Sequence, residues 1–358
     1  MSRLAPEGLA PEGLAPEVSG GLPGLGHVVE FRRDPVGLLR RGQREHGAVF
    51  AFRLLRTRVT VCAGPPVHGA FFDAPKDALS ARHVYQFTIP IFGPGVVYDV
   101  PPEVAVTQLG FMLPGLREER LRAYARVMQE EAEAYVEAWD DAGEVDLPTV
   151  LKELTVFIAS RCLIGQEFRQ RLSREFARIY DDLQGGIALL AFLNPHLPLP
   201  AFRRRDRARA HLGTIVAGIM AERRRDGRAG DDVLDTLMGA RYADGRALAD
   251  EEVTGLLVAL AFAGQNTSAV LAAWTGVLLL GHPEHLSAVL DEQRRVLGDD
   301  AAITLPALRD LVVLERCLKE AERLHPPIVM LMRRALRDVE VDGRLAPAGG
   351  LVMVSPAL

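Results

Sequence analysis

The feature that most constrains the fold is a long uncharged stretch, because no Asp, Glu, Lys or Arg occurs between Glu252 and His282. As a helix it would span about 40 Å at 1.5 Å per residue, which is enough to cross a membrane. Its middle, however, carries the run Gly264-Gln265-Asn266-Thr267-Ser268, where a bilayer is least tolerant of polar side chains. The sequence therefore favours a helix buried inside a globular protein over a membrane span, with bounds near residues 250–281.

The polar run inside this helix has two interpretations. Successive residues of an α-helix turn by about 100°, so polar residues at four successive positions surround the axis and some of them point inward. One interpretation is a wet, functional cavity at this level, with a local distortion at Gly264. The other is that the hydroxyls of Thr267 and Ser268 bond to backbone carbonyls one turn earlier. The residues alone leave both interpretations open.

Composition and charge exclude several classes of protein. The chain is 48% apolar and 25% charged, as is ordinary for a globular protein, and its formal charge of -5 argues against a nucleic-acid partner. Two arginine clusters, at residues 203–207 and 223–225, are interpreted as solvated ends of one helix. The first residues show neither a secretory signal nor an anchor helix, so we expect a cytoplasmic protein without a membrane anchor.

The three cysteines give no sign of a disulfide framework or a zinc site. Cys62, Cys162 and Cys317 are odd in number, far apart and embedded in apolar runs. We therefore interpret them as small buried side chains.

The order of local patterns predicts a mainly α protein with a small β region. Residues 4–17 repeat the unit Leu-Ala-Pro-Glu-Gly, so residues 1–26 are predicted to be a flexible Pro/Gly-rich leader, and residues 27–358 a single domain. A helix to His46 and a hairpin of residues 48–54 and 57–62 follow. Helices dominate from residue 101 to residue 325, including residues 118–141, and strands return at residues 339–341 and 351–354. Strands do not alternate with helices, which excludes a doubly wound sheet.

Three separated motifs resemble those of one family, the cytochromes P-450. The run Ala263-Gly264-Gln265-Asn266-Thr267 is similar to the Ala/Gly-Gly-x-x-Thr motif of their distal helix. The run Glu320-Ala321-Glu322-Arg323, followed by Leu324-His325-Pro326-Pro327, resembles their Glu-x-x-Arg helix and its proline exit. Residues 85–99 resemble the recognition segment of the sterol 14α-demethylases, in particular the bacterial ones, with the pattern Tyr-x-Phe-x-x-Pro-x-Phe-Gly-x-Gly-Val-x-x-Asp. The order and separation of the motifs match the family, and similarity covers nearly everything after the leader.

The resemblance implies a haem-thiolate monooxygenase with the P-450 fold. Such an enzyme uses haem and O2 to oxidise an apolar, sterol-like substrate, with electrons from NAD(P)H through a ferredoxin or similar donor. Its implied catalytic residues are Thr267, which positions protons, and Gln265 and Asn266, which shape that network. The other implied roles are haem contact by Tyr85, Ala263, Gly264 and Arg333, scaffold support by Glu320 and Arg323, and substrate contact by Phe87, Phe92, Tyr98 and Met330.

Two of these residues have a simpler explanation as well. Glu320 and Arg323 fit a surface ion pair at i,i+3 spacing, because Leu314, Leu318 and Ala321 place the apolar stripe away from Arg323. Arg333 fits a solvated arginine beside Arg334.

Three departures from the family pattern limit the resemblance. Sterol demethylases usually carry a histidine where this chain has Asn266, which cannot titrate. The run at residues 108–113 is uncharged where the family offers a basic residue to a haem propionate. The glycine-rich loop with the haem-ligating cysteine would lie beyond Leu358, so this chain supplies no metal ligand and, by itself, is expected to be inactive.

These departures keep other functions open. One alternative is a monooxygenase of a non-sterol terpenoid or polyketide. Another is a non-catalytic helical remnant, or a lipid-binding protein that lacks the haem thiolate.

Overall fold

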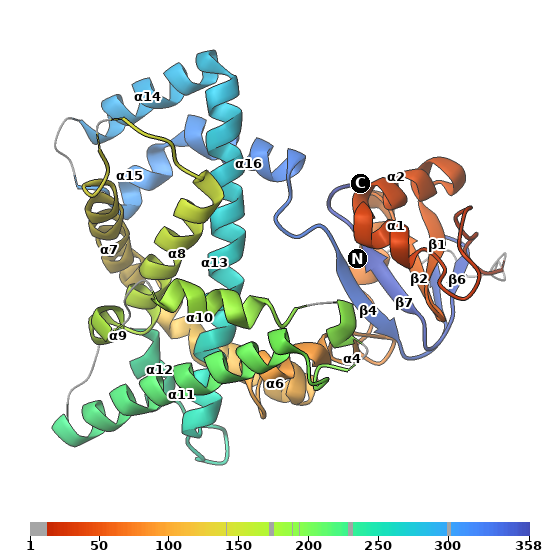
Figure 1. Ribbon diagram of the computed structural model, residues 1–358, viewed down its shortest axis with the longest axis horizontal. Helices are drawn as coiled ribbons and strands as arrows, with labels where there is room; N and C mark the ends of the chain where they lie inside the picture. The colour runs from red at the N-terminus through yellow and green to blue at the C-terminus, as the bar shows by residue number, and fades with distance from the viewer. Residues whose placement is uncertain are drawn as a thin grey trace. The chain divides into compact units, whose positions relative to one another are not determined.

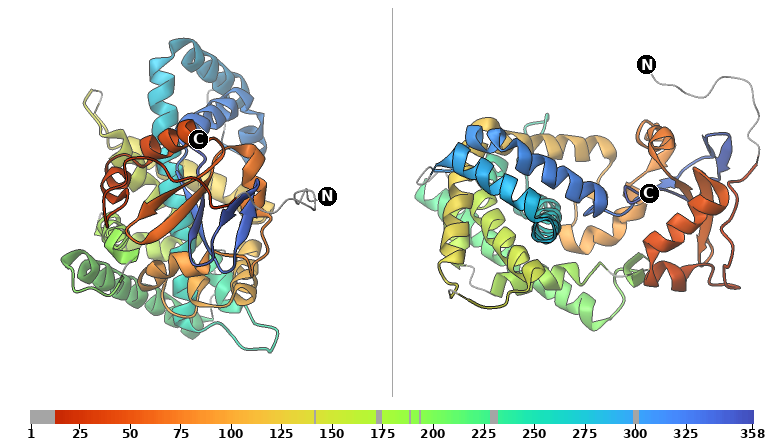
Figure 2. Two further views of the ribbon diagram at one scale, coloured as in Figure 1. Left: turned by 90° about the vertical axis from the view of Figure 1, so that its right-hand side faces the viewer. Right: turned by 90° about the horizontal axis from the view of Figure 1, so that it is seen from above.

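A computed structural model describes residues 13–140, 142–171, 175–187, 189–192, 194–227, 232–298 and 302–358. The chain forms two compact units, which are described separately (Figures 1 and 2). The sheet unit comprises the chain up to Tyr85 together with Ile328–Leu358. The helical unit comprises Gln86–Pro327. The expected mainly α architecture with a small β region is confirmed, whereas the single domain over residues 27–358 stays a prediction.

The sheet unit contains short helices and two sheets. Its helices are α1 (Val28–Arg33), α2 (Pro35–His46), α3 (Pro65–Phe72) and α4 (Arg82–Tyr85). Its strands are β1 (Val49–Leu54), β2 (Thr57–Cys62), β3 (Leu79–Ser80), β4 (Leu331–Ala335), β5 (Val339–Val341), β6 (Arg344–Ala346) and β7 (Leu351–Val354). The larger sheet has the order β1-β2-β7-β4-β3, in which only β2 and β7 pair in parallel (Figure 2). The chain thus returns after more than two hundred residues to complete the sheet that its first strands begin.

Both faces of the larger sheet are buried, and alternate residues of each strand belong to different apolar clusters. Val49 and Ala51 of β1 pack with Val352 of β7 on one face. Phe50 and Met353 pack with other side chains on the opposite face. Side chains of a strand alternate between faces, so this pairing register fixes which apolar residues meet.

The described part of the expected leader, residues 13–26, packs against β1. The Val18 N–H donates to the Ala51 carbonyl at 2.8 Å, and the Ala51 N–H donates to the Pro16 carbonyl at 2.7 Å. Ala15 and Val18 are only 1% and 3% exposed. Because β1 is an edge strand, its free backbone groups can bond to an extended, proline-containing segment. Composition suggested a leader without structure up to Gly26, but these residues make specific contacts; residues 1–12 lie outside the described residues.

The helical unit is built around one long helix, α13 (Asp250–Gly281), as Figure 1 shows. The helices before it are α5 (Ile89–Phe92), α6 (Pro102–Met112), α7 (Glu118–Val136), α8 (Leu147–Leu163), α9 (Gln166–Arg171), α10 (Glu175–Gln184), α11 (Pro200–Asp226) and α12 (Val233–Gly239). Those after it are α14 (Pro283–Leu297), α15 (Leu305–Asp310) and α16 (Val312–Leu324). Short 3-10 turns occur at Gln86–Thr88, Val97–Asp99, Leu113–Leu116 and Leu189–Phe192.

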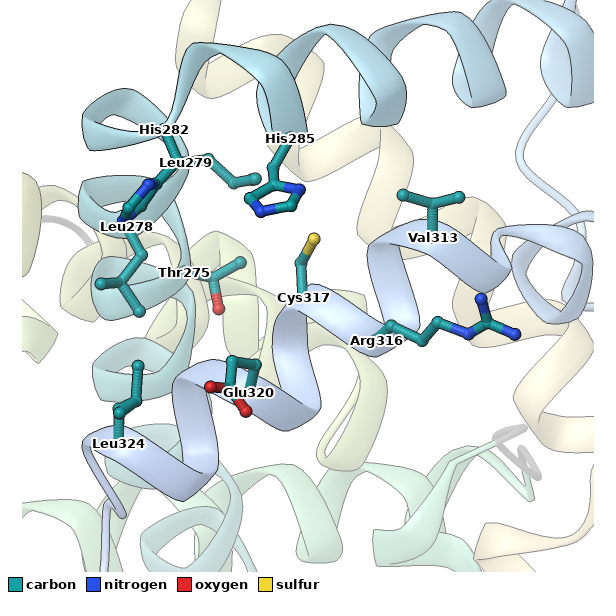
Figure 3. Close-up of a pocket in the computed structure, with 10 residues that line it drawn as sticks. All are labelled: Thr275, Leu278, Leu279, His282, His285, Val313, Arg316, Cys317, Glu320 and Leu324. Atoms are coloured by element: carbon teal, nitrogen blue, oxygen red, sulfur yellow. The ribbon is translucent and has the colours of Figure 1, made fainter.

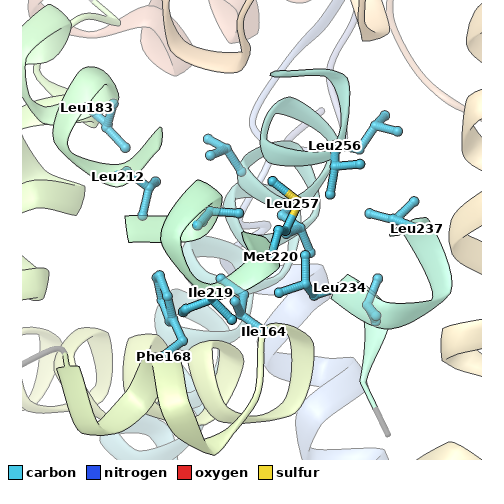
Figure 4. Packing of buried hydrophobic residues seen from close by; sticks show 14 of the residues in the cluster. Ile164, Phe168, Leu183, Leu212, Ile219, Met220, Leu234, Leu237, Leu256 and Leu257 are labelled. Atoms are coloured by element: carbon cyan, nitrogen blue, oxygen red, sulfur yellow. The ribbon is translucent and has the colours of Figure 1, made fainter. Parts of the chain in front are cut away.

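The first half of α13 is a core helix. By length and composition it could cross a membrane. All residues from Val253 to Val258 are nevertheless buried, and α13 packs on α8, α11, α12 and α16. The core beside it contains residues from five other helical segments, among them Ile164, Phe168, Leu183, Leu212, Ile219, Met220, Leu234 and Leu237 (Figure 4). The charge-free stretch is therefore explained by burial over its first half.

Candidate active site

Thr267 lies in the second half of α13, and its side chain bonds to its own helix. The hydroxyl donates to the Ala263 carbonyl at 2.7 Å, with a longer contact of 3.3 Å to the Gly264 carbonyl. This is the back-bond that the second interpretation of the polar run anticipates. A hydroxyl that donates to a carbonyl keeps both of its lone pairs for accepting. Thr267 can therefore still accept a hydrogen bond from water or substrate.

Gln265 and Asn266 point away from Thr267. Gln265 is 1% exposed and faces α8, where its Nε2 donates to the Lys152 carbonyl at 3.2 Å. Its Oε1 is buried and has no hydrogen-bond partner among the described residues. Asn266 lines a different space, a cavity of about 320 Å³ that also borders Pro148 and Trp274. The hydrogen bonds of Gln265 and Thr267 thus lead to different elements, and the expected three-residue network is not assembled in this conformation.

An aromatic wall forms on α13 directly before Ala263. The ring of Phe92 meets Phe262 edge-on at 5.8 Å between centroids, and Tyr98 lies 6.5 Å from Phe92. Tyr180 of α10 packs on the other side of Phe262 at 4.6 Å. The structure thus brings two of the expected substrate residues, Phe92 and Tyr98, to the turn of α13 that precedes Ala263 and Gly264. Phe87 is buried and packs on Phe192 at 4.0 Å.

A glycine on α13 permits this close approach. A Cβ added to Gly255 would lie 2.4 Å from the Phe92 carbonyl oxygen and 2.7 Å from Cγ2 of Val96. Only a residue without a side chain lets the recognition segment sit on α13 at this distance. Gly255 is therefore part of what positions Phe92.

Tyr85, Met330 and Arg333 lie in the sheet unit. The Met332 N–H donates to the Tyr85 hydroxyl at 3.1 Å, and Met330 packs in the same apolar cluster as Tyr85. Burial raises the pKa of Tyr85. The Arg333 guanidinium donates to the Phe71 carbonyl at 2.6 Å and lies over the Phe71 ring. Burial lowers the pKa of Arg333, and among the described residues no carboxylate pairs with it, so the site suits an anionic group.

Glu320 and Arg323 form a bidentate ion pair on the surface of α16. Arg323 Nε donates to Glu320 Oε2 at 2.8 Å, and the side chains are 66% and 55% exposed. Glu320 also borders a cavity of about 530 Å³ between α13, α14 and α16, into which His285 and Cys317 point (Figure 3). The predicted i,i+3 surface pair is thus present; support of a haem scaffold stays a prediction.

None of the three cysteines is placed as a thiolate ligand. Burial raises the pKa of the Cys62 and Cys162 thiols to about 12. Burial also raises the pKa of Cys317. A thiolate is the form that binds iron, so these three side chains are unsuited to that role as they lie.

Comparison with known proteins now gives the class. A family model described as Cytochrome P450 matches residues 16–358, and the chain therefore belongs to the cytochrome P450 family of haem-dependent monooxygenases. A solved structure described as retinoic acid bound cyanobacterial CYP120A1 shares the fold, with a TM-score of 0.83 at 24% identity over 96% of this chain and 77% of that one.

The most similar relatives narrow the subfamily. "Sterol 14-demethylase" of Arabidopsis thaliana is 41% identical, covering 94% of this chain and 70% of that protein. "Sterol 14alpha-demethylase" of Mycobacterium tuberculosis is 39% identical, covering 95% of this chain and 76% of that protein. "Lanosterol 14-alpha demethylase" of Bos taurus is 38% identical over 94% of this chain and 68% of that protein. These relatives include plant and mammalian proteins, so they do not single out the bacterial branch.

Two features of the structure fit the haem that the family implies. Ala263 and Gly264 are exposed, and a Cβ added to Gly264 would meet nothing within 4 Å outside its own helix among the described atoms. That side of α13 is therefore open to a flat ligand. In the sheet unit, the half-buried Arg333 lacks a carboxylate partner, as noted above, and is suited to a propionate.

Sequence reasoning missed several residues of this site. Phe262 directly precedes the Ala/Gly-Gly-x-x-Thr motif, and that position was the available signal for it. Tyr180 carried no signal, because nothing local places α10 against α13. Gln108 was noticed only as part of an uncharged run, although it is buried and fully engaged by hydrogen bonds.

Proposed function

We propose that this protein is a sterol 14α-demethylase-type monooxygenase. The observation that carries the proposal is the aromatic wall of Phe92, Tyr98 and Phe262, which adjoins Ala263 and Gly264 on α13. Flat polycyclic lipids bind in largely apolar, aromatic pockets with few polar groups. The identity of about two-fifths to proteins named sterol 14-demethylases, over most of the chain, supports the same substrate class.

Haem would be held by the open face at Ala263 and Gly264, and through its propionates by Arg333, with Tyr85 beside that arginine. When bound, haem supplies the activation of O2. The chain's own contribution is to orient the sterol on the aromatic wall, to exclude water from it, and to hold a proton donor at Thr267 Oγ1. We further propose that electrons arrive from NAD(P)H through a ferredoxin or similar donor, and that the enzyme acts in the cytoplasm.

Thr267→Ala in the haem-loaded enzyme tests the role of the hydroxyl. Without the Thr267 acceptor, a water or substrate hydroxyl is no longer oriented for proton delivery, so product per NADPH consumed should fall by about tenfold or more. Haem content and folding should be unchanged, because the back-bond of Thr267 contributes little to the helix. Ser268→Ala, at the next position, is the matched control and should retain the parent's ratio. An unchanged ratio in Thr267→Ala would remove Thr267 from the catalytic residues.

A second candidate is oxidation of a non-sterol terpenoid or polyketide. The observation that favours it is Asn266, which stands where the family usually has histidine and which borders a cavity with Pro148 and Trp274 instead of meeting Thr267. Asn266→His should raise the product ratio with lanosterol if the enzyme is a sterol demethylase. No effect, together with no product from lanosterol or obtusifoliol in the parent, would favour the second candidate.

A further inference from the structure

The recognition segment contains a residue in an uncommon backbone conformation. Val97 has a φ of 53°, in the left-handed region, which β-branched residues rarely adopt. It lies between Gly95 and Tyr98, and therefore beside one of the aromatic residues of the wall. Such a conformation persists only where the surrounding structure holds it in place.

One buried side chain holds this backbone from below. Gln108 of α6 is 1% exposed, and its Oε1 accepts the Val97 N–H at 3.2 Å. Its Nε2 donates to the Gly95 carbonyl at 2.8 Å and to the Tyr242 hydroxyl at 2.9 Å. Every hydrogen-bonding atom of the amide is thus used, and two of the three bonds fix the backbone of Gly95–Val97.

The chain of hydrogen bonds continues to the start of α13. The Tyr242 hydroxyl, which accepts from Gln108, donates to Glu252 Oε1 at 3.1 Å. The Glu252 carboxylate in turn accepts the Ala249 N–H at 2.7 Å and pairs with Arg246 at 2.7 Å. Gln108, Tyr242 and Glu252 therefore tie the segment to the first turn of the helix that carries Phe262 and Thr267.

The neighbouring acid of α13 holds the other side of the segment. Glu251 pairs with the buried Arg209 at 2.6 Å, and Arg209 also donates to the Phe92 carbonyl at 3.2 Å. A Cβ added to Gly93 would lie 2.7 Å from the Arg209 guanidinium and 2.9 Å from Glu251. Consecutive residues of one helical turn thus reach the segment from two directions.

We propose that Gln108 and Tyr242 are positioning residues that set which sterol the enzyme accepts. They fix the backbone of Gly95–Val97, and this backbone determines where Phe92 and Tyr98 stand in the aromatic wall. Neither residue needs to touch the substrate. The selectivity part of this inference rests on the proposed function, whereas the part concerning the backbone does not.

Hydrogen–deuterium exchange of the protein without sterol tests the backbone part. Gln108→Met keeps the length of the side chain and removes its hydrogen bonds, so exchange over residues 93–99 should accelerate by about tenfold. Tyr242→Phe should produce a smaller acceleration, because the bonds from Gln108 to Gly95 and Val97 remain. Asp250→Asn is the matched control, since it removes the Arg224–Asp250 ion pair from the same helical turn and should leave this segment unchanged.

Binding of two sterols to the haem-loaded enzyme tests the selectivity part. The ratio of the Kd for lanosterol to the Kd for obtusifoliol should change by about threefold or more in Gln108→Met, and by less in Tyr242→Phe. The double variant should add little to Gln108→Met, because the two residues act in one chain of bonds. Loss of stability alone would weaken both sterols equally and would leave the ratio unchanged.

The two measurements separate the failure of each idea. Unchanged exchange over residues 93–99 in Gln108→Met refutes the positioning role, whatever the parent binds. Faster exchange with an unchanged Kd ratio refutes the link to selectivity. A parent that binds neither sterol refutes the proposed substrate class and with it the sterol selectivity, whereas the exchange result still decides whether Gln108 fixes the segment.

Discussion

The sheet unit and the helical unit bury their side chains in different ways. In the sheet unit, alternation along the strands sorts apolar residues onto two faces, and the described buried residues include no Arg, Lys, Asp or Glu. In the helical unit, an apolar core lies beside buried ionic side chains. These include Arg205, Arg209, Arg223, Asp232, Glu131 and Glu292.

Arg223 shows what the buried charges do. This residue of α11 is 4% exposed and pairs with Asp232 at 2.6 Å and with Glu167 at 2.7 Å. It also donates to the Ile164 carbonyl at 3.2 Å. A helix satisfies its own backbone, so contacts between side chains decide how helices are placed against one another. Here one guanidinium joins α9, α11, α12 and the end of α8, whereas in the sheet unit the backbone ladder itself joins the strands.

The largest effect is expected where a buried ionic group loses its partner. Arg223→Met leaves the carboxylates of Glu167 and Asp232 uncompensated and should lower the free energy of unfolding by about 3–5 kcal/mol. Urea denaturation followed by circular dichroism measures it. The control is Arg224→Met, which removes an exposed pair with Asp250 and should cost about 0–1 kcal/mol. Equal losses in the two variants would contradict the distinction between the units.

A somewhat smaller effect is expected from a cavity in the sheet unit. Leu39 of α2 is fully buried, and Leu39→Ala should lower the free energy of unfolding by about 3 kcal/mol. Arg40→Ala, at the exposed next position, should change it by less than about 0.5 kcal/mol. A loss confined to the sheet unit in peptide-resolved exchange would show that the two units unfold separately.

Acid should affect the helical unit at the start of α13. Burial opposes ionisation of Glu252, but hydrogen bonds from Arg246 and the Ala249 N–H outweigh it, so the pKa of Glu252 is lowered. The bond from Arg224 lowers the pKa of Asp250 in the same way. A carboxyl whose pKa is lower in the folded state stabilises it above the unfolded pKa, and that stability is lost as pH falls through the folded value.

Stability should therefore decline below about pH 4.5, and less steeply in Glu252→Gln than in the parent. Exchange of peptides around residues 242–252 should accelerate in acid before that of the sheet strands. The reverse order would place the acid-sensitive groups elsewhere.

The smallest effect is expected at the exposed ion pair of α16. Glu320 and Arg323 bond to each other, and their solvent exposure screens the attraction. Arg323→Gln in the 358-residue chain should leave the urea midpoint unchanged within error. A clear destabilisation would mean that this pair supports the helical unit in a way that its exposure hides.

Local patterns predicted the elements well, and pairing over long distances escaped them. The long helix, the first hairpin and the strands Val339–Val341 and Leu351–Val354 are confirmed, because each has a pattern within its own residues. Strand β4 was missed, since its two arginines hide an interior strand whose partners lie far away in the chain. The solvated helix ends predicted for the arginine clusters were wrong for Arg205 and Arg223, because their carboxylate and carbonyl partners come from other segments.

The site was predictable to the same extent. The motifs correctly selected Phe92, Tyr98 and Thr267, because these residues stand at fixed spacings. The divergence of Gln265 and Asn266 around α13 follows from its rotation in the fold, which depends on α8 and not on the motif.

Gly93 has a consequence for how the enzyme can change during evolution. Any side chain there would meet Arg209 and Glu251, so a substitution at residue 93 is tolerated only after that ion pair has been lost. Phe92 carries no such condition and can vary first. The order of mutations is therefore constrained, and lineages that explore new substrates should replace the aromatic residues long before they replace the glycine.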